Sequence, residues 1–112
     1  YEFRNLRAAP FRVSHVRTFR AGLYHKITTQ DPEFNCMKNK QNQWYDSAYD
    51  VALCYPMLEM AGSKHVFHNT HKLYVYNRDN PISDDKVDQA KQWSIHEEIL
   101  SKKPFKKIEN YK

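Results

Sequence analysis

Residues 44–62 read Trp-Tyr-Asp-Ser-Ala-Tyr-Asp-Val-Ala-Leu-Cys-Tyr-Pro-Met-Leu-Glu-Met-Ala-Gly, and they predict an apolar helix with a marked start and a marked end. Ser47 stands three residues before Asp50, which is the spacing of a capping box at the amino end of a helix. The apolar run 51–61 follows directly, and Gly62 is a natural C-terminal stop. The other predicted elements lie before or after this helix in the sequence.

A second helix is expected before this stretch, at roughly residues 14–27. Its apolar residues recur at helical spacing (Val13, Val16, Phe19, Leu23 and Ile27), and Ser14 is a plausible N-cap. Residues 28–43 are polar and contain Asp31-Pro32, which is typical of a loop.

Two residues disturb these predicted helices. Pro56 has no N–H to bond to the carbonyl of Ala52, so we expect it to kink the helix over 51–61 or to split it in two. Gly22 lies inside the helix over 14–27 and costs up to about 1 kcal/mol relative to Ala, which suggests close packing at that point.

The C-terminal half predicts a strand and a third helix. A short β segment is expected near His65–His68, and residues 72–77 form the best strand because they are rich in β-branched and aromatic side chains. A helix capped at Ser83 should run to about Ser101, where Pro104 prevents its continuation. The expected fold class is therefore α+β, mainly helical, with about three helices and one or two short strands.

Length and composition limit the function classes. A chain of 112 residues with 40% hydrophobic and 28% charged residues forms one soluble domain, residues 1–112. Two glycines cannot make a glycine-rich phosphate loop, and no apolar run reaches the length of a membrane span. Two cysteines without a CxxC motif favour a reducing compartment, so the expected location is cytoplasmic.

The charge is unevenly distributed. Residues 1–30 carry six basic side chains and one acidic, residues 101–112 carry five and one, and residues 31–100 hold seven basic against eleven acidic. Basic ends of this kind favour anionic partners such as phosphate, nucleotide, nucleic acid or a membrane surface, although surface Lys and Arg also simply maintain solubility.

Four stretches, in their order and spacing, carry a resemblance to a known family. They are His15-Val-Arg-Thr-Phe-Arg-Ala-Gly-Leu-Tyr, the stretch 44–62, Leu73-Tyr-Val-Tyr-Asn-Arg-Asp-Asn-Pro, and residues 92–104. Together they resemble the C-terminal, acceptor-side part of nucleotide-sugar-dependent glycosyltransferases of family 2, GT-A type. The last stretch departs from the family pattern, because Leu100 stands where an Arg is expected.

The resemblance implies a fragment of an enzyme that transfers a sugar from a nucleotide-sugar to an acceptor hydroxyl of a carbohydrate or glycan. The N-terminal half, which binds the nucleotide and holds Mg²⁺ or Mn²⁺ on a DxD motif, is absent, since the chain contains no DxD triplet. No cofactor is expected in this chain, and the isolated chain is expected to be inactive. A homodimer is a possible assembly, because a lone strand leaves both edges unpaired.

The same resemblance makes Asp50 the candidate general base, held in the first turn of a helix where backbone N–H groups favour a carboxylate. The alternative is that Asp50 only closes the capping box with Ser47. Trp44, Tyr45 and Asp46 are candidate acceptor-binding residues; the two rings suit the apolar face of a sugar but serve equally as core anchors. Asp46 is also the second candidate for the base, with a surface acid or an alternative N-cap as its structural explanation.

Arg17 and Arg20 are candidate phosphate contacts, and solvated or acid-paired side chains are the alternative. Glu59, inside an apolar run, needs a partner if it is buried, and an ion pair with Arg17 or Arg20 is expected. His65, His68 and His71 form an HxxHxxH run, but their spacing does not suit the usual zinc sites, so no metal is assigned. Cys54 is expected to be a small core residue.

Two functions of other classes remain open. Arginines interleaved with aromatic residues near the amino end would suit a small basic module that binds single-stranded nucleic acid, although no known nucleic-acid motif is present and the acidic middle would repel phosphate. A purely structural, self-associating domain is the other alternative.

Overall fold

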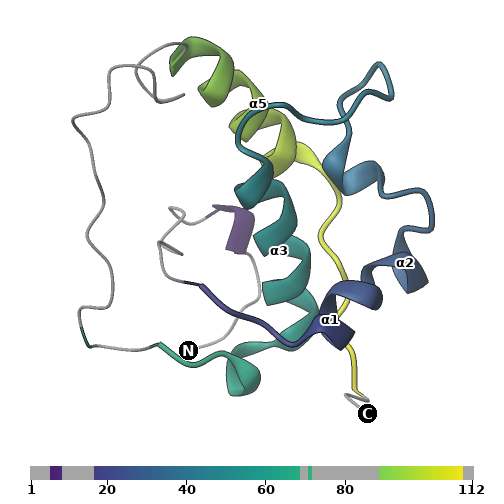
Figure 1. Ribbon diagram of the computed structural model, residues 1–112, viewed down its shortest axis with the longest axis vertical. Coiled ribbons are helices and arrows are strands. Elements are labelled where there is room, and N and C mark those ends of the chain that lie inside the picture. The colour runs from purple at the N-terminus through teal and green to yellow at the C-terminus, as the bar shows by residue number, and fades with distance from the viewer. Residues whose placement is uncertain (1–5, 9–16, 69–70, 72–88, 110–112) are drawn as a thin grey trace.

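The computed structural model of the chain describes residues 6–8, 17–68, 71 and 89–109, and this part is mostly helical (Figure 1). Its elements in chain order are η1 (Leu6–Ala8), α1 (Ala21–His25), α2 (Ile27–Gln30), η2 (Asn35–Met37), α3 (Tyr49–Ala61), η3 (Ser63–His65) and α5 (Gln89–Ser101). The described residues form no strand; an isolated antiparallel bridge joins Lys38 and Trp44.

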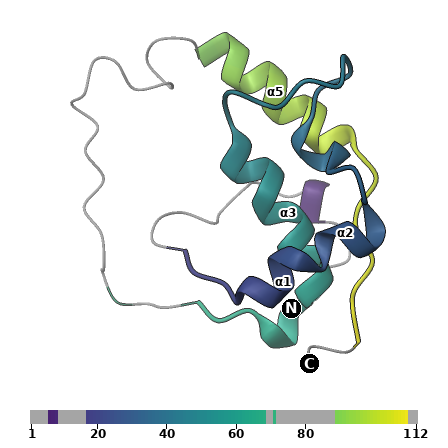
Figure 2. The same cartoon turned by 45° about the vertical axis from the view of Figure 1, so that its right-hand side comes forward.

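Helix α3 lies at the centre of the molecule. Nine of its 13 residues are buried, and they face several directions around the helix axis. A helix that is apolar on all sides must be covered on all sides. Figures 1 and 2 show α5 near one end of α3, α1 near the other, and the segment after α5 running alongside.

Two apolar clusters hold these parts together, and α3 contributes to both. The first contains Tyr45, Ala48, Val51, Ala52, Tyr55 and Ile99, so it joins α3 to α5. The second contains Ile27, Cys36, Met57 and Met60, with Phe105 and Ile108 packed against them. The loop 31–37 and the C-terminal segment therefore depend on the same helix.

The C-terminal segment after α5 is fixed by backbone hydrogen bonds as well as by packing. The N–H of Ile108 donates to the carbonyl of Met60 over 2.9 Å. The side chain of Gln30 donates to the carbonyl of Lys106 over 2.8 Å and accepts from its N–H over 2.7 Å. Because polypeptide groups far apart in sequence satisfy one another here, the segment is an integral part of the fold.

The helix predicted over 51–61 is confirmed as α3, although the capping box is wrong. The N-cap is Ala48, in the left-handed conformation (φ 54°, ψ 21°), and it makes no side-chain cap. Ser47 is buried instead, and its Oγ has no hydrogen-bond partner among the described residues. Pro56 does not split the helix, and Gly62 ends it as predicted, with φ 73° and ψ 163°.

The helix predicted over 14–27 is wrong at residues 17–20, and residues 14–16 lie outside the described part of the chain. Residues 17–20 are not helical, Arg20 is extended, and two short helices, α1 and α2, follow in its place. From this non-helical segment Arg17 forms an ion pair with Asp50 of α3, and this contact holds the segment against α3. Gly22 is not closely packed, because nothing lies within 4 Å of a Cβ built there.

The remaining predictions divide between confirmed, wrong and untested. Residues 28–43 are largely loop, interrupted by the end of α2 and by η2. The β segment near 65–68 is wrong, since η3 and irregular backbone occupy that stretch. The strand 72–77, Ser14 and the cap at Ser83 lie outside the described residues, whereas the end of the third helix at Ser101 is confirmed by α5.

No helix in the described part of the chain combines the length and the apolar character that crossing a membrane requires.

Candidate functional site

Asp50 lies in the first turn of α3 and is held by Arg17. The Nη1 of Arg17 donates to Oδ2 of Asp50 over 2.9 Å, and the same nitrogen lies 3.6 Å from Sγ of Cys54. The side chain of Asp50 is 42% exposed and that of Arg17 only 19%. Arg17 thus contacts both polar groups on one side of α3, while the carboxylate of Asp50 still reaches solvent.

The surroundings of this pair have a clear electrostatic balance. Burial alone would lower the pKa of Arg17, but its hydrogen bond to Asp50 and the nearby Cys54 and Asp50 charges raise that pKa above its ordinary value. Burial raises the pKa of the Cys54 thiol, although Arg17 opposes the shift. Cys54 is therefore an inert, buried thiol, as the sequence predicts for a small core residue.

The side chains of Trp44 and Tyr45 lie on opposite sides of the loop that precedes α3. The side-chain oxygen of Asn39 accepts from the N–H of Gln41 and of Gln43, which closes a tight turn. The N–H of Tyr45 then donates to the carbonyl of Met37 over 2.9 Å. Successive side chains in such extended backbone alternate, so Trp44 is 63% exposed while Tyr45 is buried.

The two rings consequently differ in what they can contact. The ammonium of Lys38 lies 4.6 Å from the ring centre of Trp44, whose surface remains open to solvent. Tyr45 donates from its hydroxyl to Glu98 over 3.1 Å, and burial together with Glu98 raises the pKa of that hydroxyl. A sugar can reach Trp44 as it lies, whereas Tyr45 would first have to leave the core.

Asp46 and Arg20 lie on the surface. Asp46 accepts from the ammonium of Lys91 over 2.6 Å, and this bond lowers the pKa of the Asp46 carboxyl. Arg20 is exposed, and its backbone carbonyl accepts from the N–H of Leu23 at the start of α1. The structure thus brings Arg17 to Asp50. Asp46 instead pairs with Lys91 of α5, and Arg20 lies at the amino end of α1.

The expected partner of Glu59 is wrong. Arg7 in η1, and not Arg17 or Arg20, makes a two-pronged contact with the Glu59 carboxylate at 2.8 and 3.1 Å, and both side chains are about 5% exposed. Nη1 of Arg7 also donates to the carbonyls of Ile99 and Lys102 at the end of α5. The position of Glu59 in an apolar run predicted that it would have a buried partner, but no sequence pattern around Arg7 indicated that Arg7 is this partner.

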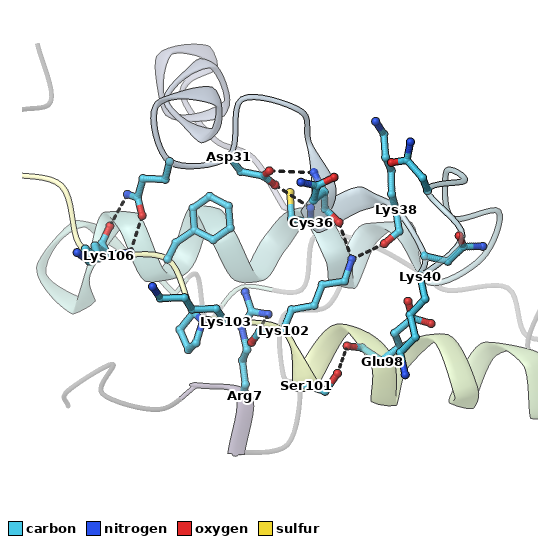
Figure 3. Close-up of a pocket in the computed structure, with 16 residues that line it drawn as sticks. Arg7, Asp31, Cys36, Lys38, Lys40, Glu98, Ser101, Lys102, Lys103 and Lys106 are labelled. Carbon is cyan, nitrogen blue, oxygen red and sulfur yellow. Dashed lines mark hydrogen bonds between the residues drawn. The ribbon is translucent and has the colours of Figure 1, made fainter.

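A hollow of about 710 Å³ lies between the loop 30–42 and the segment 98–106. We call it the basic hollow, because its lining includes six basic side chains against two acidic ones: Arg7, Lys38, Lys40, Lys102, Lys103 and Lys106, with Asp31 and Glu98. Figure 3 shows Lys106 at one end, Lys38 and Lys40 at the other, and Lys102 between them. Asp50 does not line it, and nothing in the composition had located it.

Lys102 and Asp31 fix the walls of the basic hollow. The ammonium of Lys102 donates to the backbone carbonyls of Asn35, over 2.5 Å, and of Lys38. Asp31 accepts from the N–H groups of Asn35 and Cys36 at 2.9 and 2.7 Å. Burial lowers the pKa of Lys102 and, with Asp31, raises the pKa of the Cys36 thiol to about 12.

No cluster of His, Cys, Asp and Glu suitable for a metal ion occurs among the described residues, which include His65, His68 and His71. The ring of His65 instead lies 3.2 Å, through Nδ1, from the carbonyl of Ala61. Comparison of the chain with protein-family models, curated proteins and solved structures found no match.

Proposed function

We propose that this chain forms the acceptor side of a family 2, GT-A type glycosyltransferase that uses a nucleotide-sugar, and that Asp50 is its general base. The proposal rests on the four stretches that resemble this family and on one structural observation. A carboxylate 42% exposed stands at the amino end of a mostly buried helix, and Arg17 holds one of its oxygens. A base needs this combination of fixed position and access to an incoming hydroxyl.

The proposed reaction inverts the anomeric centre. The carboxylate of Asp50 takes the proton of the acceptor hydroxyl while that oxygen attacks the anomeric carbon of the donor sugar. A new carbon–oxygen bond forms as the bond between the sugar and the nucleoside diphosphate breaks, and the diphosphate leaves with the electron pair. Because Arg17 bonds to Oδ2 only, the second oxygen of Asp50 is the one that would receive the proton.

The neighbouring residues then have distinct roles. Trp44, with its exposed ring, would stack on the apolar face of the acceptor sugar. Arg17 would orient the base, a role that fits its ion pair better than contact with a phosphate does. Asp46 would contact an acceptor hydroxyl from the surface, in exchange for its bond to Lys91.

The donor sugar, the nucleotide and the Mg²⁺ or Mn²⁺ that the resemblance implies would belong to a separate, nucleotide-binding half. The described residues offer no group of ligands for such an ion, so no role for a metal is assigned to them.

The experiment uses a protein in which this chain is joined to a donor-binding half encoded next to it. Release of nucleoside diphosphate is measured with panels of nucleotide-sugars and glycan acceptors. The Asp50→Asn variant should lower kcat by about 10²–10⁴-fold and leave donor affinity nearly unchanged, because only proton transfer is lost. Transfer at the wild-type rate by Asp50→Asn would disprove the assignment of the base.

Two further variants sharpen the test. Glu97→Gln removes an exposed carboxylate from α5 and serves as the matched control, which should keep full activity. Asp46→Asn should raise the KM for the acceptor and leave kcat largely intact. A loss of kcat in Asp46→Asn alone would transfer the role of base to Asp46.

A further inference from the structure

The basic hollow holds positive charge that the fold itself does not neutralise. Arg7 is occupied by Glu59, and Lys102 by backbone carbonyls. Four lining lysines remain, and among the described residues none of them forms an ion pair with a carboxylate: Lys38, Lys40, Lys103 and Lys106. The ammonium of Lys38 lies over the ring of Trp44 instead. Uncompensated like charges in one concave site repel one another unless an anion occupies it.

The two acidic residues of the basic hollow offset only part of its positive charge. Both oxygens of Asp31 accept backbone N–H groups of η2, and Glu98 accepts from the hydroxyl of Tyr45. A hydrogen bond does not remove the charge of a carboxylate, but six basic side chains against two acidic ones leave the lining with a net positive charge that attracts an anion.

The walls that carry the lysines are tied together before any ligand binds. Lys102 links the end of α5 to the loop at residues 35 and 38, and Gln30 makes two hydrogen bonds with the backbone of Lys106. A preorganised site loses less entropy on binding than a flexible one. The volume of about 710 Å³ falls within the usual range of ligand sites.

The basic hollow offers charge but little surface for stacking. Phe105 is its one aromatic lining residue in the described part of the chain, and it packs against the second apolar cluster. The side-chain amides of Gln30 and Asn39 are already bonded within the protein. Single-stranded nucleic acid binds largely by stacking its bases on aromatic rings, so this site suits a different polyanion.

We propose that the basic hollow binds an acidic oligosaccharide, whose sulfate or carboxylate groups contact lysines at both ends of the site. Such a chain repeats its anionic groups along its length, so one group can reach Lys106 while another reaches Lys38 and Lys40 at the opposite end of the basic hollow (Figure 3). Asp50 does not line this site, but the ammonium of Lys38 lies over the ring of Trp44, so the proposed acceptor-binding residue borders it.

The test is direct binding of the 112-residue chain to a sulfated hexasaccharide prepared from heparin. Calorimetric titration at about 50 mM salt, where surface charges are weakly screened, should detect binding that weakens as salt is added. A neutral maltohexaose should not bind. Equal binding of the neutral hexasaccharide would overturn the proposal.

The matched variants locate the site. Lys40→Ala/Lys106→Ala removes one exposed charge from each end of the basic hollow, and Lys64→Ala/Arg20→Ala removes two exposed charges elsewhere. The first double variant should bind the sulfated hexasaccharide about tenfold more weakly, because two charge contacts are lost, and the second should bind like wild type. Thermal melting confirms that both variants are folded. Equal weakening in the two would show binding by net charge alone and overturn the site.

The last arm separates the two classes of polyanion. A hexathymidylate at the same concentration of negative charge should compete poorly with the sulfated hexasaccharide. Competition on equal terms would show that the basic hollow does not distinguish saccharides from nucleic acid, and the proposal would then be wrong.

Discussion

At the scale of single residues, two kinds of ion pair serve different purposes in this protein. The pair of Arg7 and Glu59 is sealed inside, and the N–H of Phe105 donates to the same carboxylate over 3.2 Å. The pair of Lys91 and Asp46 lies on the surface. A buried pair is costly to break because one charge is left without compensation, whereas a solvated pair is screened by water.

We therefore expect Glu59→Gln to lower the free energy of unfolding by about 3–5 kcal/mol, because the buried guanidinium of Arg7 loses its counter-charge. Asp46→Asn is the matched change at the surface and should leave stability unchanged. Urea denaturation followed by circular dichroism measures both variants. Similar midpoints for the two would show that Arg7 and Glu59 are solvated in solution.

The residue scale also shows what sequence patterns could anticipate. Glu59 inside an apolar run predicted a buried acid with a partner, and that is confirmed. The partner, Arg7, lies 52 positions away and carries no local signal, so only the folded chain identifies it. In the same way Ser47 had the spacing of a cap, but packing drew it into the core and left Ala48 as the N-cap.

At the scale of elements, the predictable helices are those whose signals are local. Helix α3 combines an apolar run with a glycine stop, and α5 ends before Pro104, so their boundaries could be anticipated. The helix over 14–27 could not, because Arg17 is held by Asp50, 33 positions away, in a segment that is not helical. In this segment the long-range contact, and not the periodicity of the apolar residues, determines where the backbone is helical.

The two glycines provide the test at this scale. Gly62 has φ 73° and ψ 163°, a conformation almost confined to glycine, and a Cβ there would lie 2.8 Å from Cε of Lys107. Gly62→Ala should therefore cost about 1–3 kcal/mol, mainly through backbone strain, since the lysine side chain can move aside. Gly22→Ala, in open space within α1, should instead gain up to about 1 kcal/mol.

Thermal unfolding of both glycine variants provides the measurement. A fall in Tm for Gly62→Ala and a rise for Gly22→Ala would confirm that the backbone conformation at position 62 requires glycine, whereas the conformation at position 22 does not. A rise in Tm for Gly62→Ala would mean that the turn after α3 has an ordinary backbone conformation.

At the scale of the whole molecule, the arrangement depends on segments from both sides of α3. The mainly helical character could be predicted from composition and spacing, and so could the placing of Asp50 in a first helical turn. The basic hollow could not, because its lysines come from two stretches far apart in sequence, which Lys102 and Gln30 join through contacts 67 and 76 positions apart. Charge counts identified two basic ends but not the concave surface to which both contribute residues.

The C-terminal segment should accordingly be part of one cooperative unit with α3. Phe105 is partly buried against the cluster of Ile27, Met57 and Met60, whereas Phe67 is 89% exposed. Phe105→Ala should cost about 2–3 kcal/mol, somewhat below the range for a fully buried ring. Phe67→Ala removes the same atoms from the surface and should change stability by less than about 0.5 kcal/mol. Urea denaturation should show a single transition for both variants, shifted only for Phe105→Ala; equal midpoints would mean that the segment after α5 undocks before α3 unfolds.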